Sequence, residues 1–403
     1  MARPDTLAQT LAMIRTANVS LKAFTAVRDE LSATSMARQL SGPLAGKLVA
    51  VKDIFDTADF PTAYGSPIYS GHQPSTEAAM VGIVRQAGAL VIGKAVTTEF
   101  AYLQPAPTLN PAAPGCTPGG SSSGSAAAVA AGLVQLALGS QTGGSTVRPA
   151  SYCGIAGFKP SFGVLPTAGM KCFSWSLDTV GLFARTVTEV SEFARAASGQ
   201  RIMAPAAREP GEWTVGVPES YPWGEVSASA RQAMARAVQA LGDAGARVVP
   251  CTLPTWAGDA FGAHDTVQGW EAARAMALEM DTGLDRLSPL LRQFLLACRH
   301  ITDDSYALAQ AVARQARLDC RDWLPGIDVL LTPSAPDEPP LGYASTGAST
   351  FNRAWTLLGT PCLGVPGAVG INNRPMGLQL VAPPGGDSDC LAAGLLLERA
   401  LGG

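Results

Sequence analysis

Short apolar runs alternate with longer stretches of helical periodicity along most of this sequence. Apolar runs bounded by turn residues predict strands at 48–52, 89–92, 213–217, 247–250, 329–331, 363–369 (which Pro366 interrupts) and 376–381. Amphipathic periodicity predicts one or two helices at 7–40, and further helices at 75–88, 125–138, 229–243, 265–322 and 388–401. Strands that alternate with helices predict an α/β fold with a central mixed β-sheet covered by helices on both faces.

The length of the chain allows either one large α/β domain or two to three smaller ones. The chain has 403 residues, against ~150 for an average domain. The sequence contains no internal repeat and no clear linker between independent domains. We therefore expect residues 1–403 to form a single domain.

Charge is scarce in the sequence and mixed in sign. Charged residues make up 15% and hydrophobic residues 47%, and the net charge is −3 at pH 7. An average soluble protein has roughly 25% charged residues. This composition argues against a disordered chain, and the lack of a basic face removes the electrostatic case for a nucleic-acid partner.

Cysteine and histidine give no sign of a metal site. The eight cysteines and three histidines are scattered, without a Cys-x-x-Cys pair or a Cys/His cluster. Structural zinc sites are built from such clusters. We expect no metal, no cofactor, and reduced thiols that pack as small apolar residues.

The segment from Phe100 to Val147 contains no charged residue and no histidine. Its best apolar run, 126–138, is shorter than the ~20 residues of a membrane-spanning helix and contains Gly132 and Gln135. Glycine, serine and proline flank the run. We therefore expect no membrane helix, and the absence of an apolar signal core at the N-terminus predicts a cytoplasmic protein.

Two short motifs in the sequence fit known sites only in part. Residues 88–94 almost match a phosphate-binding loop, but Ala95 replaces the required hydroxyl and the intervening residues form an apolar strand. Residues 120–124 match the Gly-x-Ser-x-Gly nucleophile elbow, but a loop precedes them instead of a strand. The downstream histidines, His264 and His300, have sequence contexts typical of surface residues. Neither motif predicts function here.

Two Gly/Ser-rich segments, 119–125 and 139–145, flank an apolar helix. Such loops turn backbone N–H groups inward and form anion sites or oxyanion holes. A serine nucleophile also needs a base, and a lysine buried among uncharged groups loses its proton easily enough to act as one. Lys52, at the end of an apolar strand, is the best-placed lysine; Lys159 is second, and Lys94 and Lys171 are weaker candidates.

These segments resemble the amidase signature family. The resemblance rests on GGSSSGSAAAVAAG at 119–132, GSQTGGSTVRPA at 139–150 and GFKP at 157–160, with further agreement at 42–53, 87–94, 97–100, 110–111 and 375–380. It covers nearly the whole chain and is weaker over 200–330. It implies the amidase signature fold, with a catalytic core at about 45–195, a variable and largely helical segment at about 200–330, and a C-terminal part, 330–403, that returns to the core.

The resemblance implies a catalytic triad and a reaction. The nucleophile is Ser145, the bridging residue is Ser121, which follows a cis peptide bond, and the base is Lys52. Backbone N–H groups of Thr142, Gly143, Gly144 and Ser145 form the oxyanion hole. The implied function is hydrolysis of a small linear amide through a serine acyl-enzyme. Homodimers are common among relatives.

The chain departs from most of the family at two positions of the 139–150 segment. Gln141 stands where most members have Asp, and Arg148 comes three residues after the nucleophile instead of two. This pattern resembles the malonamidase-like branch, in which the arginine suits a substrate carboxylate. The resemblance therefore implies a carboxylate-bearing amide, such as a malonamate-like one, as a candidate substrate. Arg148 is therefore either a substrate-binding residue or a structural residue of the loop. Gly120 and Trp355 are further candidates for substrate contact.

Two other functions remain open at this point. One is the A-type subunit of a glutamine-dependent aminoacyl-tRNA amidotransferase, which works with partner subunits. The other is a non-catalytic binding protein on the same scaffold.

Overall fold

The computed structural model describes residues 4–204, 208–322 and 324–402. Its strands are β1 Phe24–Val27, β2 Leu48–Lys52, β3 Leu90–Ala95, β4 Leu136–Gln141, β5 Ala156–Lys159, β6 Thr179–Ala184, β7 Thr214–Pro218, β8 Arg247–Cys251, β9 Val329–Pro333, β10 Cys362–Val365 and β11 Leu378–Val381. Its α-helices are α1 Pro4–Leu21, α2 Glu30–Ala37, α3 Ala79–Gln86, α4 Ser123–Ala130, α5 Val147–Cys153, α6 Val187–Ala197, α7 Ala228–Asp243, α8 Thr255–Ala275, α9 Ala277–Gly283, α10 Pro289–Cys298, α11 Asp303–Asp319, α12 Arg353–Leu358 and α13 Asp387–Ala400.

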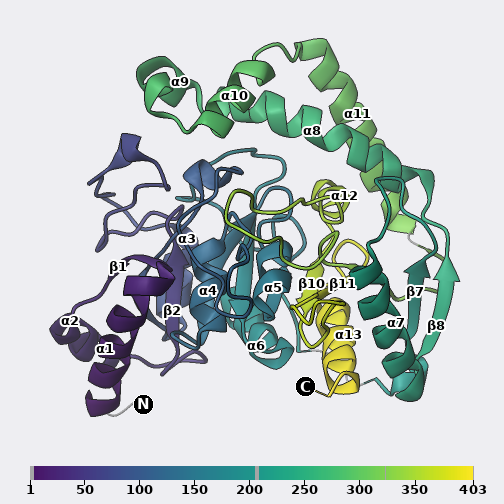
Figure 1. Ribbon diagram of the computed structural model, residues 1–403, viewed down its shortest axis with the longest axis horizontal. Helices are drawn as coiled ribbons and strands as arrows, with labels where there is room; N and C mark the ends of the chain where they lie inside the picture. Colours follow the sequence, from purple (N-terminus) through teal and green to yellow (C-terminus); the bar gives the residue numbers. More distant parts are fainter. Residues whose placement is uncertain (1–3, 205–207, 323, 403) are drawn as a thin grey trace.

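All the strands belong to one 11-stranded sheet, in the order β1-β3-β2-β4-β6-β5-β10-β11-β9-β7-β8. β2 runs parallel to β3 and β4, and β7 runs parallel to β8 and β9. The other pairs, from β4–β6 through β11–β9, and β1–β3 at the edge, are antiparallel. The predicted mixed α/β sheet in a single domain is confirmed (Figure 1).

Helices cover both faces of the sheet, as predicted. Alternate residues of a strand point to opposite faces, and in β2 they belong to two different hydrophobic clusters. Val49 and Val51 belong to a cluster that also contains residues of α3, α6, α7 and α13, whereas Leu48 and Ala50 belong to one with residues of α1, α2 and α4. The two cores therefore lie on opposite faces of the sheet.

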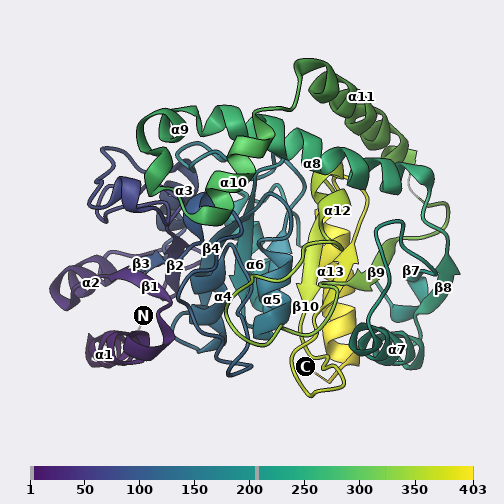
Figure 2. The same cartoon turned by 45° about the horizontal axis from the view of Figure 1, so that its top comes forward.

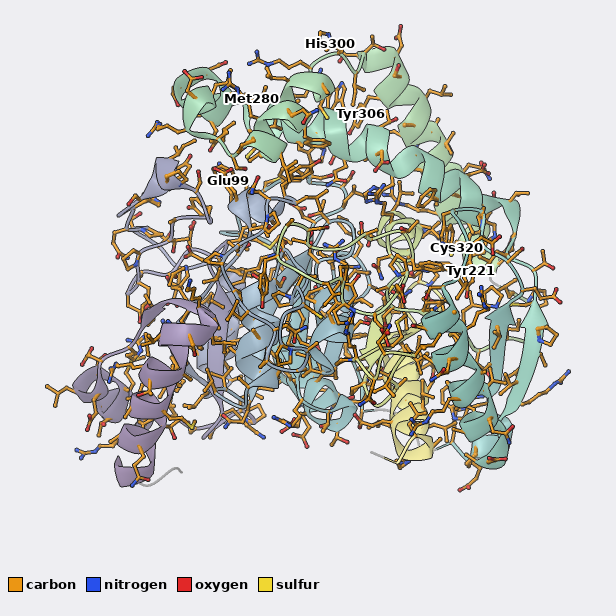
Figure 3. All side chains as sticks on the ribbon, in the orientation of Figure 1. Glu99, Tyr221, Met280, His300, Tyr306 and Cys320 are labelled. Carbon is orange, nitrogen blue, oxygen red and sulfur yellow. The ribbon has the colours of Figure 1, made fainter. Side chains whose placement is uncertain are left out.

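The predicted helical segment at 265–322 forms a layer of four helices, α8 to α11, which arches across one end of the sheet (Figures 1 and 2). A buried carboxylate ties this layer to the N-terminal half of the chain. Glu99 accepts hydrogen bonds from the Ser66 hydroxyl at 2.7 Å and from the backbone N–H of Ser288 at 2.8 Å; in Figure 3 it lies beneath Met280 of α9. Among the described residues, no helix has the length and apolarity that crossing a membrane requires.

Several elements differ from the prediction. The segment 125–138 is not one helix, because α4 ends at Ala130, Gly132 adopts a φ of +69°, and β4 begins at Leu136. The segment 7–40 contains β1 between its two helices, and β5 and β6 were not predicted. β1 forms an edge of the sheet by pairing with β3, a long-range contact that local periodicity does not report.

Candidate active site

The register of three neighbouring strands brings residues that are distant in sequence to one edge of the sheet. β2 pairs in parallel with β4, with Val51 opposite Leu138. β4 pairs antiparallel with β6, with Gln141 opposite Thr179. The end of β2, the end of β4 and the start of β6 therefore meet. Three parts of the chain lie at this meeting point: Lys52, the loop that follows Gln141, and Asp178, which precedes β6.

Lys52 is fully buried and donates hydrogen bonds to two serine hydroxyls. Its Nζ lies 2.7 Å from Ser121 Oγ and 2.8 Å from Ser140 Oγ. Burial holds the pKa of Lys52 well below its usual value; the nearby Arg148 lowers that pKa further, and Asp178 opposes both effects. A buried lysine of this kind gives up its proton readily and can serve as a base.

The other lysines that the sequence offered as bases are held elsewhere. Lys159 Nζ donates to the carbonyl oxygens of Thr360 and Pro160. Lys94 Nζ donates to the Phe55 carbonyl oxygen at 2.6 Å, and Lys171 pairs with Glu279. Lys52 is therefore the lysine that contacts a serine of the Gly/Ser-rich segments.

The chain around Ser121 is packed closely. The peptide bond between Gly120 and Ser121 is cis, as the family resemblance implies. Three residues after Ser121, Gly124 of α4 donates its N–H to the Val96 carbonyl oxygen at 3.0 Å. A Cβ on Gly124 would overlap the Ala23 carbonyl oxygen and the Val96 backbone nitrogen, so only glycine fits at this contact.

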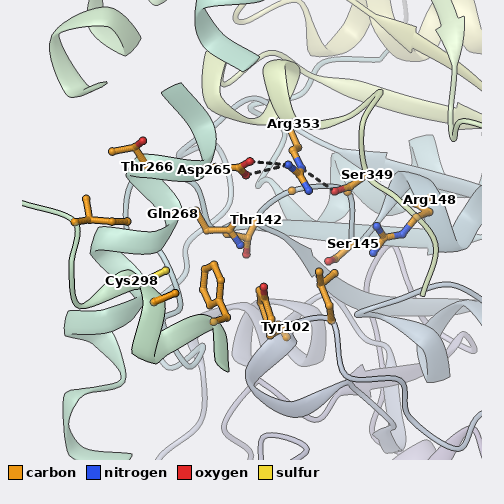
Figure 4. Close-up of a pocket in the computed structure, with 17 residues that line it drawn as sticks. Tyr102, Thr142, Ser145, Arg148, Asp265, Thr266, Gln268, Cys298, Ser349 and Arg353 are labelled. Carbon is orange, nitrogen blue, oxygen red and sulfur yellow. Dashed lines mark hydrogen bonds and ion pairs between the residues drawn. The ribbon is translucent and has the colours of Figure 1, made fainter. Parts of the chain in front are cut away.

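Ser145 lines a pocket of about 450 Å³ between the sheet edge and the helical layer (Figure 4). One wall is apolar and includes Tyr102, Leu103, Phe294 and Ile301. Tyr102 and Phe294 stack with their ring centroids 4.3 Å apart. The other wall is polar and includes Asp265, Gln268, Ser349 and Arg353. The pocket therefore offers a serine hydroxyl between an aromatic surface and a charged one.

The loop 142–145, here called the oxyanion loop after its predicted role, has a row of backbone donors beside this pocket. Among the described residues, none accepts a hydrogen bond from the N–H groups of Thr142, Gly143, Gly144 or Ser145. The next two N–H groups, of Thr146 and Val147, both donate to Gln141 Oε1, at 3.0 and 3.1 Å. Unpaired N–H groups next to a nucleophile are the donors that an oxyanion hole requires.

The amide of Gln141 explains how the chain tolerates the absence of the usual Asp. Its oxygen accepts the two N–H groups at the start of α5, which a carboxylate would also accept. Its Nε2 donates to Thr356 Oγ1 at 3.0 Å, a contact that a carboxylate could make only as an acceptor.

Arg148 is fully buried and makes hydrogen bonds to the backbone. Its Nη1 donates to the Gly347 carbonyl oxygen at 2.8 Å and its Nη2 to the Gly120 carbonyl oxygen at 2.5 Å. Burial lowers its pKa to about 10, so it remains a cation at neutral pH. It lines the pocket, but both of its terminal nitrogens have backbone partners. Of the two sequence interpretations, this geometry favours the structural one.

Two predicted substrate contacts lie outside the pocket lining. Gly120 is buried, with its carbonyl oxygen on Arg148. Trp355 is fully buried on α12 and packs edge-on against Trp223, with ring centroids 5.7 Å apart. Its large apolar ring lies in the core beneath α8 and does not line the pocket, and its contact with substrate stays a prediction.

The structure adds residues that sequence reasoning missed. Ser140 contacts Lys52, Asp178 accepts the Thr142 hydroxyl at 2.6 Å, and Arg353 lines the polar wall. His264, judged surface-like from its sequence, is fully buried, and its Nε2 donates to the Thr142 carbonyl oxygen at 2.9 Å. His300 is exposed, at the outer rim of the helical layer (Figure 3).

Within the described residues, no group of three or more His, Cys, Asp or Glu side chains is arranged to hold a metal ion.

Known proteins match this chain along nearly its whole length. The sequence model of the amidase family matches residues 5–391. The A-type subunit of the glutamyl-tRNA(Gln) amidotransferase from Methanospirillum hungatei is 32% identical over 391 residues, which cover 84% of this chain and 89% of that protein. The 2-amino-5-chloromuconic acid deaminase of Comamonas testosteroni is 31% identical, over 90% of this chain and 83% of that protein. A crystal structure of an amidase superposes with a TM-score of 0.89 at 30% identity, covering 99% of this chain and 96% of that chain.

Proposed function

The chain belongs to the amidase family, and from this premise we propose that it hydrolyses the C–N bond of a small amide through an acyl-enzyme on Ser145. The observation that carries the proposal is the position of Ser145 at the pocket, in a loop whose four backbone N–H groups have no acceptor among the described residues.

The proposed chemistry assigns one role to each part of the site. Neutral Lys52 accepts the proton of Ser121, and Ser121 accepts the proton of Ser145, whose Oγ attacks the amide carbonyl carbon. The oxyanion loop donates to the oxygen that becomes negative; the loss of one such donor costs ~3 kcal/mol of barrier. The relay then returns the proton to the leaving nitrogen, and water hydrolyses the acyl-enzyme. The short Lys52–Ser121 contact supports this relay.

For the substrate, we propose an amide whose acyl group carries a polar or anionic substituent that contacts Arg353. Nη1 of Arg353 bonds both oxygens of Asp265 at 2.9 Å, and Nε bonds Ser349 Oγ at 3.2 Å. Its Nη2 has no partner among the described residues, and the side chain is partly exposed at the pocket. Arg148, by contrast, has both terminal nitrogens on backbone carbonyls. This geometry gives no support to a malonamate-like substrate bound by Arg148.

An acidic small molecule as substrate has a parallel among the relatives, because one of them is named as a deaminase of 2-amino-5-chloromuconic acid. Charge on the substrate would be recognised at the polar wall, while its carbon skeleton lies against the Tyr102–Phe294 pair.

A second candidate function is that of an amidotransferase component of the A type, favoured by the 32% identity with such a protein. The two functions share the acyl-enzyme chemistry and differ in the fate of the ammonia, which an amidase releases to solvent and a transferase passes to a second substrate. An amidase turns over its amide as an isolated chain. A transferase component delivers ammonia to an aminoacyl-tRNA only together with its partner subunits.

The test is hydrolysis of a panel of small amides, with and without a carboxylate and including glutamine, by the isolated chain. We expect Ser145→Ala and Lys52→Ala to abolish ammonia release, and Ser123→Ala, a buried serine outside the proposed triad, to retain it. Hydroxylamine added to the wild type should yield the hydroxamate that an acyl-enzyme predicts. Equal turnover in the wild type and in Ser145→Ala would refute the proposal. Loss of preference for acidic amides in Arg353→Gln, but not in Arg353→Lys, would support the assigned substrate class.

A further inference from the structure

We propose that Asp178 is a positioning residue of the proposed reaction: its carboxylate fixes the oxyanion loop through Thr142, at the end of the sheet where Lys52 also lies, and its negative charge acts on Lys52. The proposal rests on the proposed function, because it gives Asp178 a task in the same site. Nothing in the sequence pattern singled out this residue.

The strand register brings Asp178 to the oxyanion loop. Gln141 and Thr179 are partners across β4 and β6, so the residues just beyond this pair, Thr142 and Asp178, lie opposite each other at the end of β4 and the start of β6. Thr142 Oγ1 donates to Asp178 Oδ1 at 2.6 Å. The other oxygen, Oδ2, accepts the backbone N–H groups of Phe173 at 2.7 Å and Ser174 at 3.0 Å. The carboxylate is therefore held in one orientation by three donors.

Thr142 is held from two sides. Asp178 binds its hydroxyl, and His264 of α8 donates from Nε2 to its carbonyl oxygen at 2.9 Å. Because these two contacts use the hydroxyl and the carbonyl, the N–H of Thr142 stays available to a ligand. This arrangement fixes the direction of the first donor of the oxyanion loop before substrate arrives, which is the preorganisation on which oxyanion stabilisation depends.

The charge of Asp178 is not neutralised by a contacting cation. None of the ion pairs formed by the described residues includes it, although it is almost fully buried. The charged and titratable groups around it are Lys52, Cys172 on its own loop, and Glu271 and His264 on α8; Arg148 acts on Lys52 as well. Glu271 repels the carboxylate but is itself held by Ser174 Oγ at 2.6 Å.

The charge of Asp178 changes the pKa of Lys52 in one direction, upward. Burial and Arg148 both lower the pKa of Lys52, and the negative charge of Asp178 raises it. Burial raises the pKa of Asp178 itself to about 6, against the three donors that lower it. At neutral pH Asp178 is therefore mostly ionised, and removing its charge lowers the pKa of Lys52 further.

Two variants separate the charge from the hydrogen bond. Asp178→Asn removes the charge while its amide can still contact the Thr142 hydroxyl. Thr142→Val removes the hydrogen bond and leaves the charge. The pH profile of kcat/KM on the best amide is the main readout, because a merely structural role would not move it. We expect the acid limb of Asp178→Asn to move about one unit to lower pH.

For Thr142→Val we expect kcat to fall about tenfold, as for a disturbed oxyanion donor, with the acid limb unmoved. Thr142→Ser keeps the hydroxyl and should restore most of the rate. Superimposable pH profiles of the wild type and Asp178→Asn, with both variants folded by circular dichroism, would overturn the charge role. A Thr142→Val enzyme with wild-type kcat would overturn the positioning role.

A direct titration distinguishes failure of this inference from failure of the proposed function. The chain labelled with nitrogen-15 at lysine Nζ reports the pKa of Lys52 by NMR, assigned with Lys52→Met. If no amide is hydrolysed, the proposed function fails, yet a lower pKa of Lys52 in Asp178→Asn still upholds the effect of the charge. An unchanged pKa of Lys52 refutes that effect, whatever the activity.

Discussion

Substitution of Gly144 tests the oxyanion loop at its most crowded point. A Cβ at this position would lie 2.5 Å from Asn352 Oδ1, 2.8 Å from Ser349 Cβ and 3.0 Å from Asn352 Cγ. Optimal contacts between such atoms are ~3.5 Å or longer. Asn352 cannot yield easily, because its Nδ2 donates to the Ser334 carbonyl oxygen at 3.0 Å and to Gln379 Oε1 at 3.1 Å. In Gly144→Ala the loop itself must therefore move, by about 0.5–1 Å.

A displacement of this size lowers both the rate of catalysis and the stability of the fold. Misplacement of a catalytic group by ~1 Å costs up to about 10²-fold in rate, which is ~2.7 kcal/mol of barrier. Overpacking at a buried site costs about 1–3 kcal/mol of folding free energy. For Gly144→Ala we expect kcat/KM on the best amide to fall about 100-fold, while the protein remains folded with a lowered Tm.

Gly143→Ala is the matched comparison, since the same methyl group is added one residue earlier. Its Cβ would meet nothing closer than Ser349 Oγ at 3.4 Å, an ordinary contact. We expect a loss of less than about tenfold in kcat/KM. Wild-type turnover in Gly144→Ala, or an equal loss in the two variants, would refute the argument that crowding against Asn352 fixes the loop.

Three further substitutions probe the buried polar groups around the site. Asp53→Ala removes the carboxylate that pairs with the buried Lys94 at 3.3 Å, and we expect unfolding in urea to show a loss of about 3–5 kcal/mol; a loss below ~1 kcal/mol would contradict this. Gln141→Leu leaves two N–H groups at the start of α5 without their acceptor, so we expect about 2–4 kcal/mol of destabilisation and a slower enzyme, measured by denaturation and by kcat. Lys52→Met tests whether the lowered pKa of Lys52 makes the stability of the fold depend on pH. Because burial lowers the folded-state pKa of Lys52 from 10.5, the unfolded chain binds the extra proton, and wild-type stability rises with pH between the folded pKa and 10.5. The variant should lose this part of the slope, and identical slopes would count against a depressed pKa.

The sequence was sufficient to predict those parts of the fold and of the candidate site that depend on local sequence pattern. β2 was predicted with its observed bounds, 48–52, because a short apolar run between turn residues reports a buried strand directly. The Gly/Ser-rich segments identified the pocket loop for a similar reason, since glycine marks backbone that must approach other groups closely. β4 was missed because its residues continue an alanine-rich helical pattern, and only Gly132 interrupts that pattern.

The parts of the structure that the sequence did not predict depend on contacts between residues far apart in the chain. Asp178 reaches the oxyanion loop only because β6 pairs with β4, and β6 itself was not predicted. His264 reaches the same loop from a helix of the arched layer, where local sequence is polar and resembles a surface. Trp355 was assigned to the pocket from the family resemblance, and its burial among other aromatic rings results from packing between α8 and α12.

The neutral segment from Phe100 to Val147 has a consequence for the chemistry of Lys52. It contributes Ser121 and Ser140, the two hydroxyls to which Nζ donates, so the first contacts of the amine are uncharged. The two charges that act on it most, Arg148 and Asp178, lie outside this segment and have opposite effects on its pKa. Burial among neutral groups then dominates, and it favours the unprotonated amine. Introducing an acid at Ser140 would place a negative charge against Nζ, raise the pKa of Lys52 and turn the base into one half of an ion pair. A segment without carboxylates is therefore what a lysine base at this position requires.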